Sequence, residues 1–91
     1  MTMRLNIITP EGTLVDQEVD RVEFPGAKGR FVVLKDHAPI VSSLVDGEIV
    51  FGEMPGQAGH DGGMAGHDGG VAIKSGFVEV HDNQIIACVE K

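Results

Sequence analysis

The fold of this 91-residue chain is decided by the stretch FPGAKGRFVVL, residues 24–34. Pro25 and Gly26 together are a turn signal, and Gly29 adds a second position without the restraint of a Cβ atom. The four apolar residues at positions 31–34 have the length of a short strand that is covered on both faces. The stretch therefore predicts the end of one strand, a tight turn and a second, buried strand.

Short apolar segments separated by turn residues continue along the rest of the chain. Strands are expected at residues 3–8, 13–15, 19–24, 31–34, 40–45, 48–51, 71–75, 77–81 and 85–89. Polar residues 16–18 are expected to end the second of these strands, whereas Val22 and Phe24 alternate with polar neighbours and should point inward. No window has the period of an amphipathic helix. The sequence thus predicts an all-β fold, an antiparallel β-sandwich or flattened barrel of about 8–10 short strands.

The last two predicted strands carry the clearest local signals. Asp82 and Asn83 are two turn-forming residues between apolar runs, a pattern typical of a short hairpin. Gly76 is expected to serve the backbone, at a bulge or a close approach of strands. We expect Phe77 in the core and Cys88, the only cysteine, as a buried and inert thiol. A single cysteine suits a reducing compartment.

Composition limits the possible functions. The length predicts a single domain over residues 1–91, and 42% apolar residues should supply a core without disulfides or a metal. A net charge of −7 and the absence of Trp and Tyr argue against nucleic acid as a partner. No apolar run is long enough to span a membrane. No pairing of histidine with cysteine, no acid pair in a cleft and no phosphate-binding glycine loop is visible, so no catalytic residue and no cofactor is predicted.

Positive charge is concentrated in one part of this acidic chain. Lys28, Arg30 and Lys35 lie within eight residues of one another, and His37 follows closely. Such a local reversal of sign indicates a surface that is presented to a partner. Two simpler readings stay open, because these cations can be ordinary solvated turn residues and His37 can bond a loop carbonyl.

Residues 52–70 form a glycine-rich segment in which AGHDGG occurs twice, at residues 58–63 and 65–70. Such a segment cannot bury a core, and we expect a flexible insertion at the tip of a hairpin. The alternative is a metal clip, whose candidate ligands are His60, Asp61, His67 and Asp68. Ordering the loop costs about 1–2 kcal/mol per residue, so the tolerated insertion is favoured and no metal site is predicted.

Three motifs resemble the epsilon subunit of F-type ATP synthase. The first is residues 24–34 continued by Asp36-His37-Ala38-Pro39, the second is the opening LNIITPEG at residues 5–12, and the third is SGFVEV at residues 75–80. They stand in the family's order and cover nearly the whole chain apart from the glycine-rich segment. The resemblance implies a β-sandwich at the foot of the central stalk, packed on the gamma subunit and on polar loops of the membrane c-ring.

The same resemblance implies a non-catalytic subunit that passes torque from the ring to gamma. By position, Arg30 and His37 match the family's loop that meets the ring, and with Lys28 and Lys35 they are the predicted partner-binding residues. It further implies peripheral attachment to the cytoplasmic face of the inner membrane through the complex alone, with no homo-oligomer. A free-standing β-sandwich adaptor and a metal-responsive module built on His60 and His67 are the alternatives.

The chain departs from the family pattern at several positions. Many members have glycine at the position of Val32, a Pro-Gly pair at Lys35-Asp36 and an acidic residue at Arg30, so the loop and its charge differ here. Typical members also continue into a C-terminal helical hairpin, which would begin where this sequence stops at Lys91. We expect the chain to be naturally short, and the hairpin's inhibitory and nucleotide-binding roles are not carried over.

Overall fold

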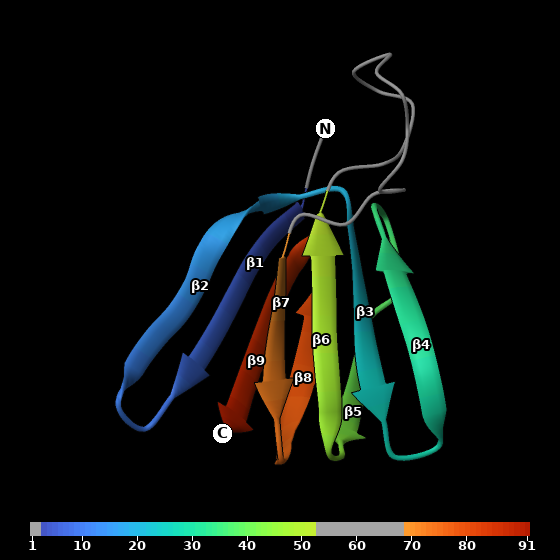
Figure 1. Cartoon of the computed structure of the whole chain (residues 1–91). Coiled ribbons are helices and arrows are strands. Elements are labelled where there is room, and N and C mark those ends of the chain that lie inside the picture. Colours follow the sequence, from blue (N-terminus) through green and yellow to red (C-terminus); the bar gives the residue numbers. More distant parts are fainter. Residues whose placement is uncertain (1–2, 53–68) are drawn as a thin grey trace, which may run out of the picture.

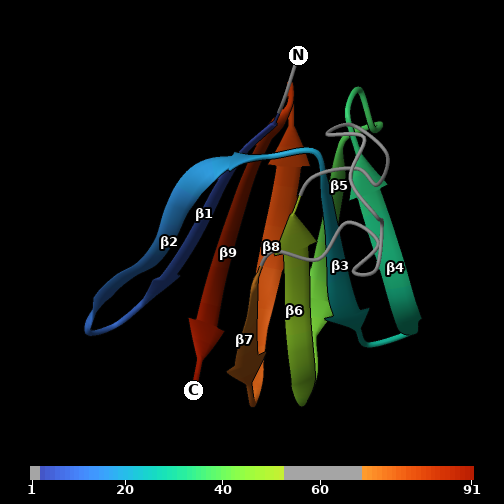
Figure 2. The ribbon, with the colours of Figure 1, turned by 45° about the horizontal axis from the view of Figure 1, so that its top comes forward.

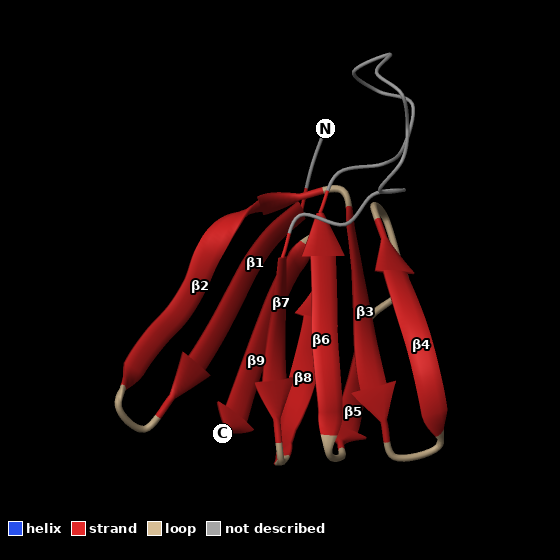
Figure 3. Cartoon of the chain, viewed as in Figure 1, coloured by secondary structure: helices blue, strands red, loops and turns tan. Residues whose placement is uncertain are grey.

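The computed structural model describes residues 3–52 and 69–91, and the described residues form strands and turns without a helix (Figures 1 and 3). The strands are β1 (Met3–Thr9), β2 (Gly12–Val19), β3 (Arg21–Gly26), β4 (Gly29–Leu34), β5 (Ile40–Leu44), β6 (Gly47–Gly52), β7 (Gly69–Ile73), β8 (Ser75–His81) and β9 (Gln84–Glu90). The all-β prediction is confirmed. Its strand positions are also correct to within a few residues, with the one exception of β2.

The strands pair into one curled sheet that folds into two layers. Their order is β2-β1-β9-β8-β5-β3-β6-β7, and β4 pairs with β3 outside this path. Figures 1 and 2 show β4, β3, β6 and β7 in one layer and β2, β1, β9, β8 and β5 in the other. Pairing is antiparallel except between β1 and β9, which run parallel. We name each layer by its two outermost strands: the β4–β7 layer runs from β4 through β3 and β6 to β7, and the β2–β5 layer runs from β2 through β1, β9 and β8 to β5.

The core lies between the two layers and is built mainly by alternate residues of β1, β3, β6, β8 and β9, with one buried residue each from β2, β4, β5 and β7. The buried apolar side chains are Met3, Leu5, Ile7, Val19, Val22, Phe24, Val33, Leu44, Ile49, Phe51, Ile73, Val78, Val80, Ile85, Ala87 and Val89. The predicted inward direction of Val22 and Phe24 is confirmed. Burial of a side chain such as Phe24 stabilises the fold by about 1.5–3 kcal/mol.

The prediction that β4 is covered on both faces is wrong. Val33 is fully buried and Phe31 is partly buried, but Val32 and Leu34 remain 39% and 43% exposed. β4 pairs only with β3 and belongs to an outer layer, so one of its faces is open to solvent. A continuous apolar run concealed the period of two that the backbone imposes on every strand.

The predicted break at residues 16–18 is wrong as well. β2 continues from Gly12 to Val19 and pairs with β1 along its length, with an irregularity between Ile7 and Ile8. Its polar residues face solvent, where Arg4 Nε donates to Asp16 Oδ1 over 2.8 Å. Exposed polar residues therefore do not end a strand at the edge of a sheet.

The β8–β9 hairpin confirms both of its local predictions. Asp82 and Asn83 have φ values of 53° and 62°, as a two-residue turn with two left-handed positions requires. Gly76 has a φ of 157°, and a Cβ atom there would lie 2.5 Å from the carbonyl oxygen of Cys88. The close approach of β8 and β9 at this point thus requires glycine.

The glycine-rich segment begins and ends in strands. Gly52 closes β6, and Gly69 and Gly70 of β7 pair with Phe51 and Val50 of β6. The remainder of the predicted insertion, residues 53–68, lies outside the described residues. A Cβ atom on Gly69 would lie 2.9 Å from the ring of Phe51, which explains glycine at this position. The candidate metal ligands lie outside the described residues; they are His60, Asp61, His67 and Asp68.

Candidate functional site

The four predicted partner-binding residues lie along β4, which is an edge strand. Lys28 is in the β3–β4 turn and Arg30 is near the start of β4, whereas Lys35 and His37 follow its end. Arg30 and Lys35 are five residues apart in extended backbone, or roughly 16 Å. The four side chains therefore form two pairs at opposite ends of one strand, with His37 half-buried and the others exposed.

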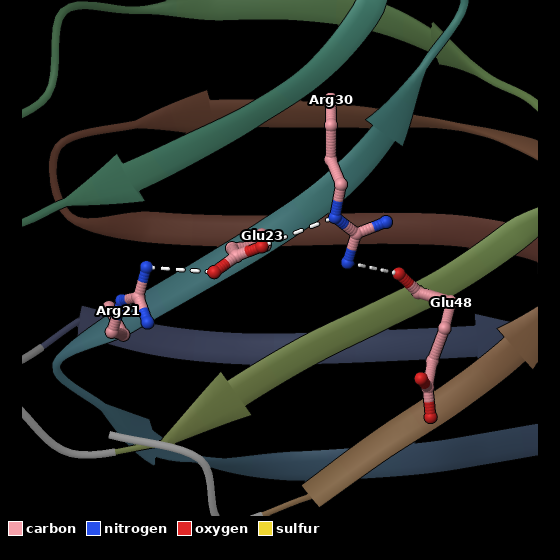
Figure 4. Close-up of polar contacts among 4 residues, drawn as sticks. All are labelled: Arg21, Glu23, Arg30 and Glu48. Carbon is pink, nitrogen blue, oxygen red and sulfur yellow. Dashed lines mark hydrogen bonds and ion pairs between the residues drawn. The ribbon is translucent and has the colours of Figure 1, made fainter. Parts of the chain in front are cut away.

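Arg30 is held across the outer face of the β4–β7 layer by a polar network (Figure 4). Its Nε donates to Glu23 Oε1 over 3.2 Å, and its Nη2 donates to the carbonyl oxygen of Glu48 over 2.7 Å. The other carboxylate oxygen of Glu23 accepts from Arg21 Nη2 over 2.8 Å. Two guanidinium groups share one carboxylate, so the network joins β3, β4 and β6 and retains one positive charge.

His37 belongs to a loop that is fastened to the opposite layer. Its Nδ1 lies 2.7 Å from the carbonyl oxygen of Ala38 and must donate to it, because that oxygen can only accept. The preceding Asp36 has a φ of 65°, its amide donates to Asn83 Oδ1 over 2.6 Å, and its carboxylate accepts from Asn83 Nδ2 over 3.1 Å. Asn83, in the β8–β9 turn, thus positions the loop that carries His37.

The outer face of the β2–β5 layer has an apolar patch that the sequence did not predict. Ile8, Cys88 and Phe77 follow one another across β1, β9 and β8, and Ile86 lies two positions from Cys88 on the same face of β9. We call these four residues the apolar face. Phe77 is 52% exposed and Ile86 41% exposed, large values for such side chains in a chain of this size.

Two sequence predictions fail on this face. Phe77 was expected in the core, but Val78 and Val80 occupy the inward positions of β8, so the period of two turns Phe77 outward. Cys88 was expected to be buried, but it is a half-buried free thiol between buried Ala87 and Val89. The sequence signal for this face is the period of two in β8: if Val78 and Val80 point inward, Phe77 must point outward.

A hollow of about 380 Å³ adjoins the ring of Phe77. Its walls come from the ends of β1, β8 and β9 and include Ile8, Pro10 and Cys88. The lining is mainly apolar, with Glu90 at one side. Such a hollow beside an exposed aromatic ring is suited to receive an apolar side chain of another protein.

Residues 3–52 and 69–91 contain no buried charged side chain and no group of three His, Cys, Asp or Glu that could hold a metal ion. Nor does any helix of sufficient length and apolarity to cross a membrane occur among them. The candidate sites on the described residues are two surfaces, the apolar face and the β4 edge.

Comparison with known proteins agrees with this architecture. The profile of a family described as "ATP synthase, Delta/Epsilon chain, beta-sandwich domain" matches residues 2–91. ATP synthase epsilon chains of Trichlorobacter lovleyi and Nitratiruptor sp. are each 38% identical, over 97% and 98% of this chain and 56% and 61% of their own length. That of Sulfurovum sp. is 44% identical over 59% of this chain and 42% of its own. The chain thus spans about half the length of these relatives.

Two solved structures share the fold at low sequence identity. A chain of the central stalk and c-ring structure of Tetrahymena thermophila mitochondrial ATP synthase superposes with a TM-score of 0.74 at 16% identity, over 100% of this chain and 65% of that one. A chain of Euglena gracilis mitochondrial ATP synthase superposes with a TM-score of 0.78 at 20% identity, over 99% and 51%. With the profile match over residues 2–91, the chain belongs to the ATP synthase delta/epsilon-chain β-sandwich family.

Proposed function

We propose that this chain is a central-stalk component of an F-type ATP synthase, which couples rotation of the c-ring to the gamma subunit during ATP synthesis. It has no catalytic role of its own. Family membership over residues 2–91 supports the proposal, and the apolar face is the single structural observation that carries it. A chain whose role is mechanical must hold a neighbour, and this face offers the means.

The apolar face is proposed to pack on the gamma subunit. Covering apolar surface stabilises an interface by about 25 cal/mol per Å², and aromatic side chains near the centre of a patch contribute most. Phe77 stands at that position, between Cys88 of β9 and Ser43 of β5, with the hollow beside it. An apolar side chain of gamma in the hollow would contact both the ring and Ile8.

The β4 edge is proposed to meet the polar loops of the c-ring. Lys28 and Arg30 supply charge at one end of the strand, and Lys35 supplies it at the other end, where His37 lies close by in sequence. Exposed charges of this kind determine register and association rate more than affinity. Because Arg30 stands where many members have an acidic residue, the matching ring loop is expected to offer carboxylate or carbonyl oxygens. The chain would attach to the cytoplasmic side of the membrane through these neighbours.

Co-expression with the gamma subunit of the same organism tests the proposal. The wild-type chain should co-purify with gamma in low and in moderate salt, because the contact is mainly apolar. Phe77→Asp should abolish co-purification, since it places a charge in the centre of the face. Leu34→Asp is the matched control, because it adds the same charge at a similarly exposed apolar position on the other layer.

Two results would count against the proposal. A wild-type chain that stays monomeric in the presence of gamma at both salt concentrations would favour a free-standing adaptor. Equal loss of gamma binding in Phe77→Asp and Leu34→Asp would show that the apolar face is not the contact. Circular dichroism of both variants checks that each remains folded.

A further inference from the structure

A groove of about 500 Å³ lies between the start of β4 and β5, beside the point where β3 and β5 join the two layers. Its walls are residues 26–31 and 40–43. Phe31 and Ile40 are half-buried in it, and Val41 is 73% exposed at its rim. The groove is separate from the apolar face, which is built on β1, β8 and β9.

One wall of the groove is the unpaired edge of β4. Residues 27 and 28 form the β3–β4 turn, so the pairs Gly26–Gly29 and Phe24–Phe31 exchange main-chain hydrogen bonds across the hairpin. The alternating residues Arg30 and Val32 consequently direct their N–H and C=O groups away from β3. Within the described residues, no strand pairs with β4 on that side.

The other wall is a partly unpaired edge of β5. The carbonyl oxygen of Ser43 accepts from the amide of Ala27 over 3.0 Å, so the main chain of Ser43 points away from β8. Val41, two residues earlier, has the same direction. The pairing of β5 with β3 is confined to Gly26 and Leu44, which leaves the main chain of Val41 without a strand beside it among the described residues.

The two unpaired edges line the same groove, so one additional strand could pair with both. Neighbouring strands in a sheet lie about 4.8 Å apart, which is the separation that such a strand would take from each edge. A partner strand lying between β4 and β5 could bond to Arg30 and Val32 on one side and to Val41 on the other. Its alternate side chains would contact Phe31 and Ile40.

The charge of the groove selects the partner. Its walls contain the cations Lys28 and Arg30 and no acidic residue, in a chain of net charge −7. The Arg30 guanidinium is bound to Glu23, so Lys28 supplies most of the charge that a partner in the groove would meet. Cationic side chains on an edge strand also oppose pairing with a second copy of the same edge. This inference rests on the proposed partner role of the β4 edge and specifies its form: we propose that the groove binds an extended acidic segment of another protein, which adds a strand between β4 and β5. This mode of recognition combines main-chain hydrogen bonds with pockets for alternate side chains.

Titration of the isotope-labelled chain with a synthetic peptide tests this site. The probe is acetyl-Glu-Val-Glu-Val-Asp-Val-amide, with two controls: the same peptide N-methylated at alternate residues, and a version with lysine at the acidic positions. Binding of the probe should shift the amide resonances of residues 30, 32 and 41 and slow hydrogen exchange at Arg30 and Val32 at least tenfold. Neither control should do so, because one lacks donors and the other repels Lys28.

Two charge variants complete the test. Lys28→Glu should weaken binding of the probe by about fivefold, whereas Lys74→Glu, in the β7–β8 connection outside the groove, should leave it unchanged. Equal binding of the N-methylated peptide, or shifts confined to other strands, would overturn the proposal. So would protection of Arg30 and Val32 by concentration-dependent dimerisation without peptide. The Lys28→Glu variant should still co-purify with gamma, because gamma is proposed to bind the apolar face and not the groove. This result distinguishes the two sites.

Discussion

The outer faces of the two layers carry different kinds of side chains. On the β4–β7 layer, the Glu23 carboxylate accepts from both Arg21 and Arg30 (Figure 4), and the exposed apolar side chains of this layer, Val32 and Leu34, are aliphatic. On the β2–β5 layer, Phe77 and Ile86 stand exposed. Polar groups that bond to one another need no partner, whereas an exposed aromatic ring gains free energy from being covered. This difference is the reason why the β2–β5 layer is proposed as the contact with gamma.

Two phenylalanines on opposite sides of the fold provide the strongest test of this comparison. Phe24→Ala should lower the free energy of unfolding by about 3–5 kcal/mol, because it empties the shared core. Phe77→Ala should change it by less than about 1 kcal/mol in the isolated chain and should still weaken gamma binding. Urea unfolding of both variants measures the difference. Similar losses of stability would mean that Phe77 is structural.

Substitution of Gly76, in the backbone beneath the apolar face, is expected to cost more stability than truncation of Phe77 on that face. Gly76→Ala should destabilise the chain by about 1–3 kcal/mol, because the added methyl group would meet the carbonyl oxygen of Cys88 at a backbone conformation that favours glycine. Gly29→Ala is the control for conformation without contact, since its φ of 127° is strained but no atom lies within 4 Å of the new Cβ. Thermal unfolding should rank Gly76→Ala as the less stable variant, and the reverse order would contradict the close approach.

The loop that carries His37 is expected to depend on one side chain in the other layer. Asn83→Gly keeps the left-handed turn and removes both hydrogen bonds to Asp36, at a cost of about 1 kcal/mol. Hydrogen exchange should accelerate at Asp36 and remain slow at Val78 in β8. Asn83→Ala should cost more, because it also strains the turn. Unchanged exchange at Asp36 would show that the loop is held by other contacts.

The smallest expected effect concerns the polar network of the β4–β7 layer. Glu23→Gln removes the carboxylate shared by Arg21 and Arg30 and should cost about 0.2–1 kcal/mol at low salt. The loss should shrink in 1 M salt, where exposed ion pairs are screened. Arg4→Gln, on the β1–β2 edge, is a matched test of another exposed pair. A salt-independent loss would point to packing rather than charge.

The sequence predicted the positions of the strands better than it predicted which side chains lie on the surface. Turn residues such as Asp82-Asn83 act locally, so they marked the strand ends correctly. The direction of Phe77 depends on the register of the whole of β8, and the split of Arg30 from His37 depends on β4 being fully extended between them. The parallel pairing of β1 with β9 joins the two ends of the chain, and no local pattern encodes it. Residue type alone placed Phe77 and Cys88 in the core.

The single cysteine offers the most direct test of the central claim that the apolar face is the contact with gamma. Cys88 lies on this face next to Phe77, and it is the only thiol in the chain. Its rate of reaction with a thiol reagent should be measured in the isolated chain and in the complex with a cysteine-free gamma subunit. The account predicts that the rate falls at least tenfold in the complex. An unchanged rate in a complex that is fully formed would contradict it.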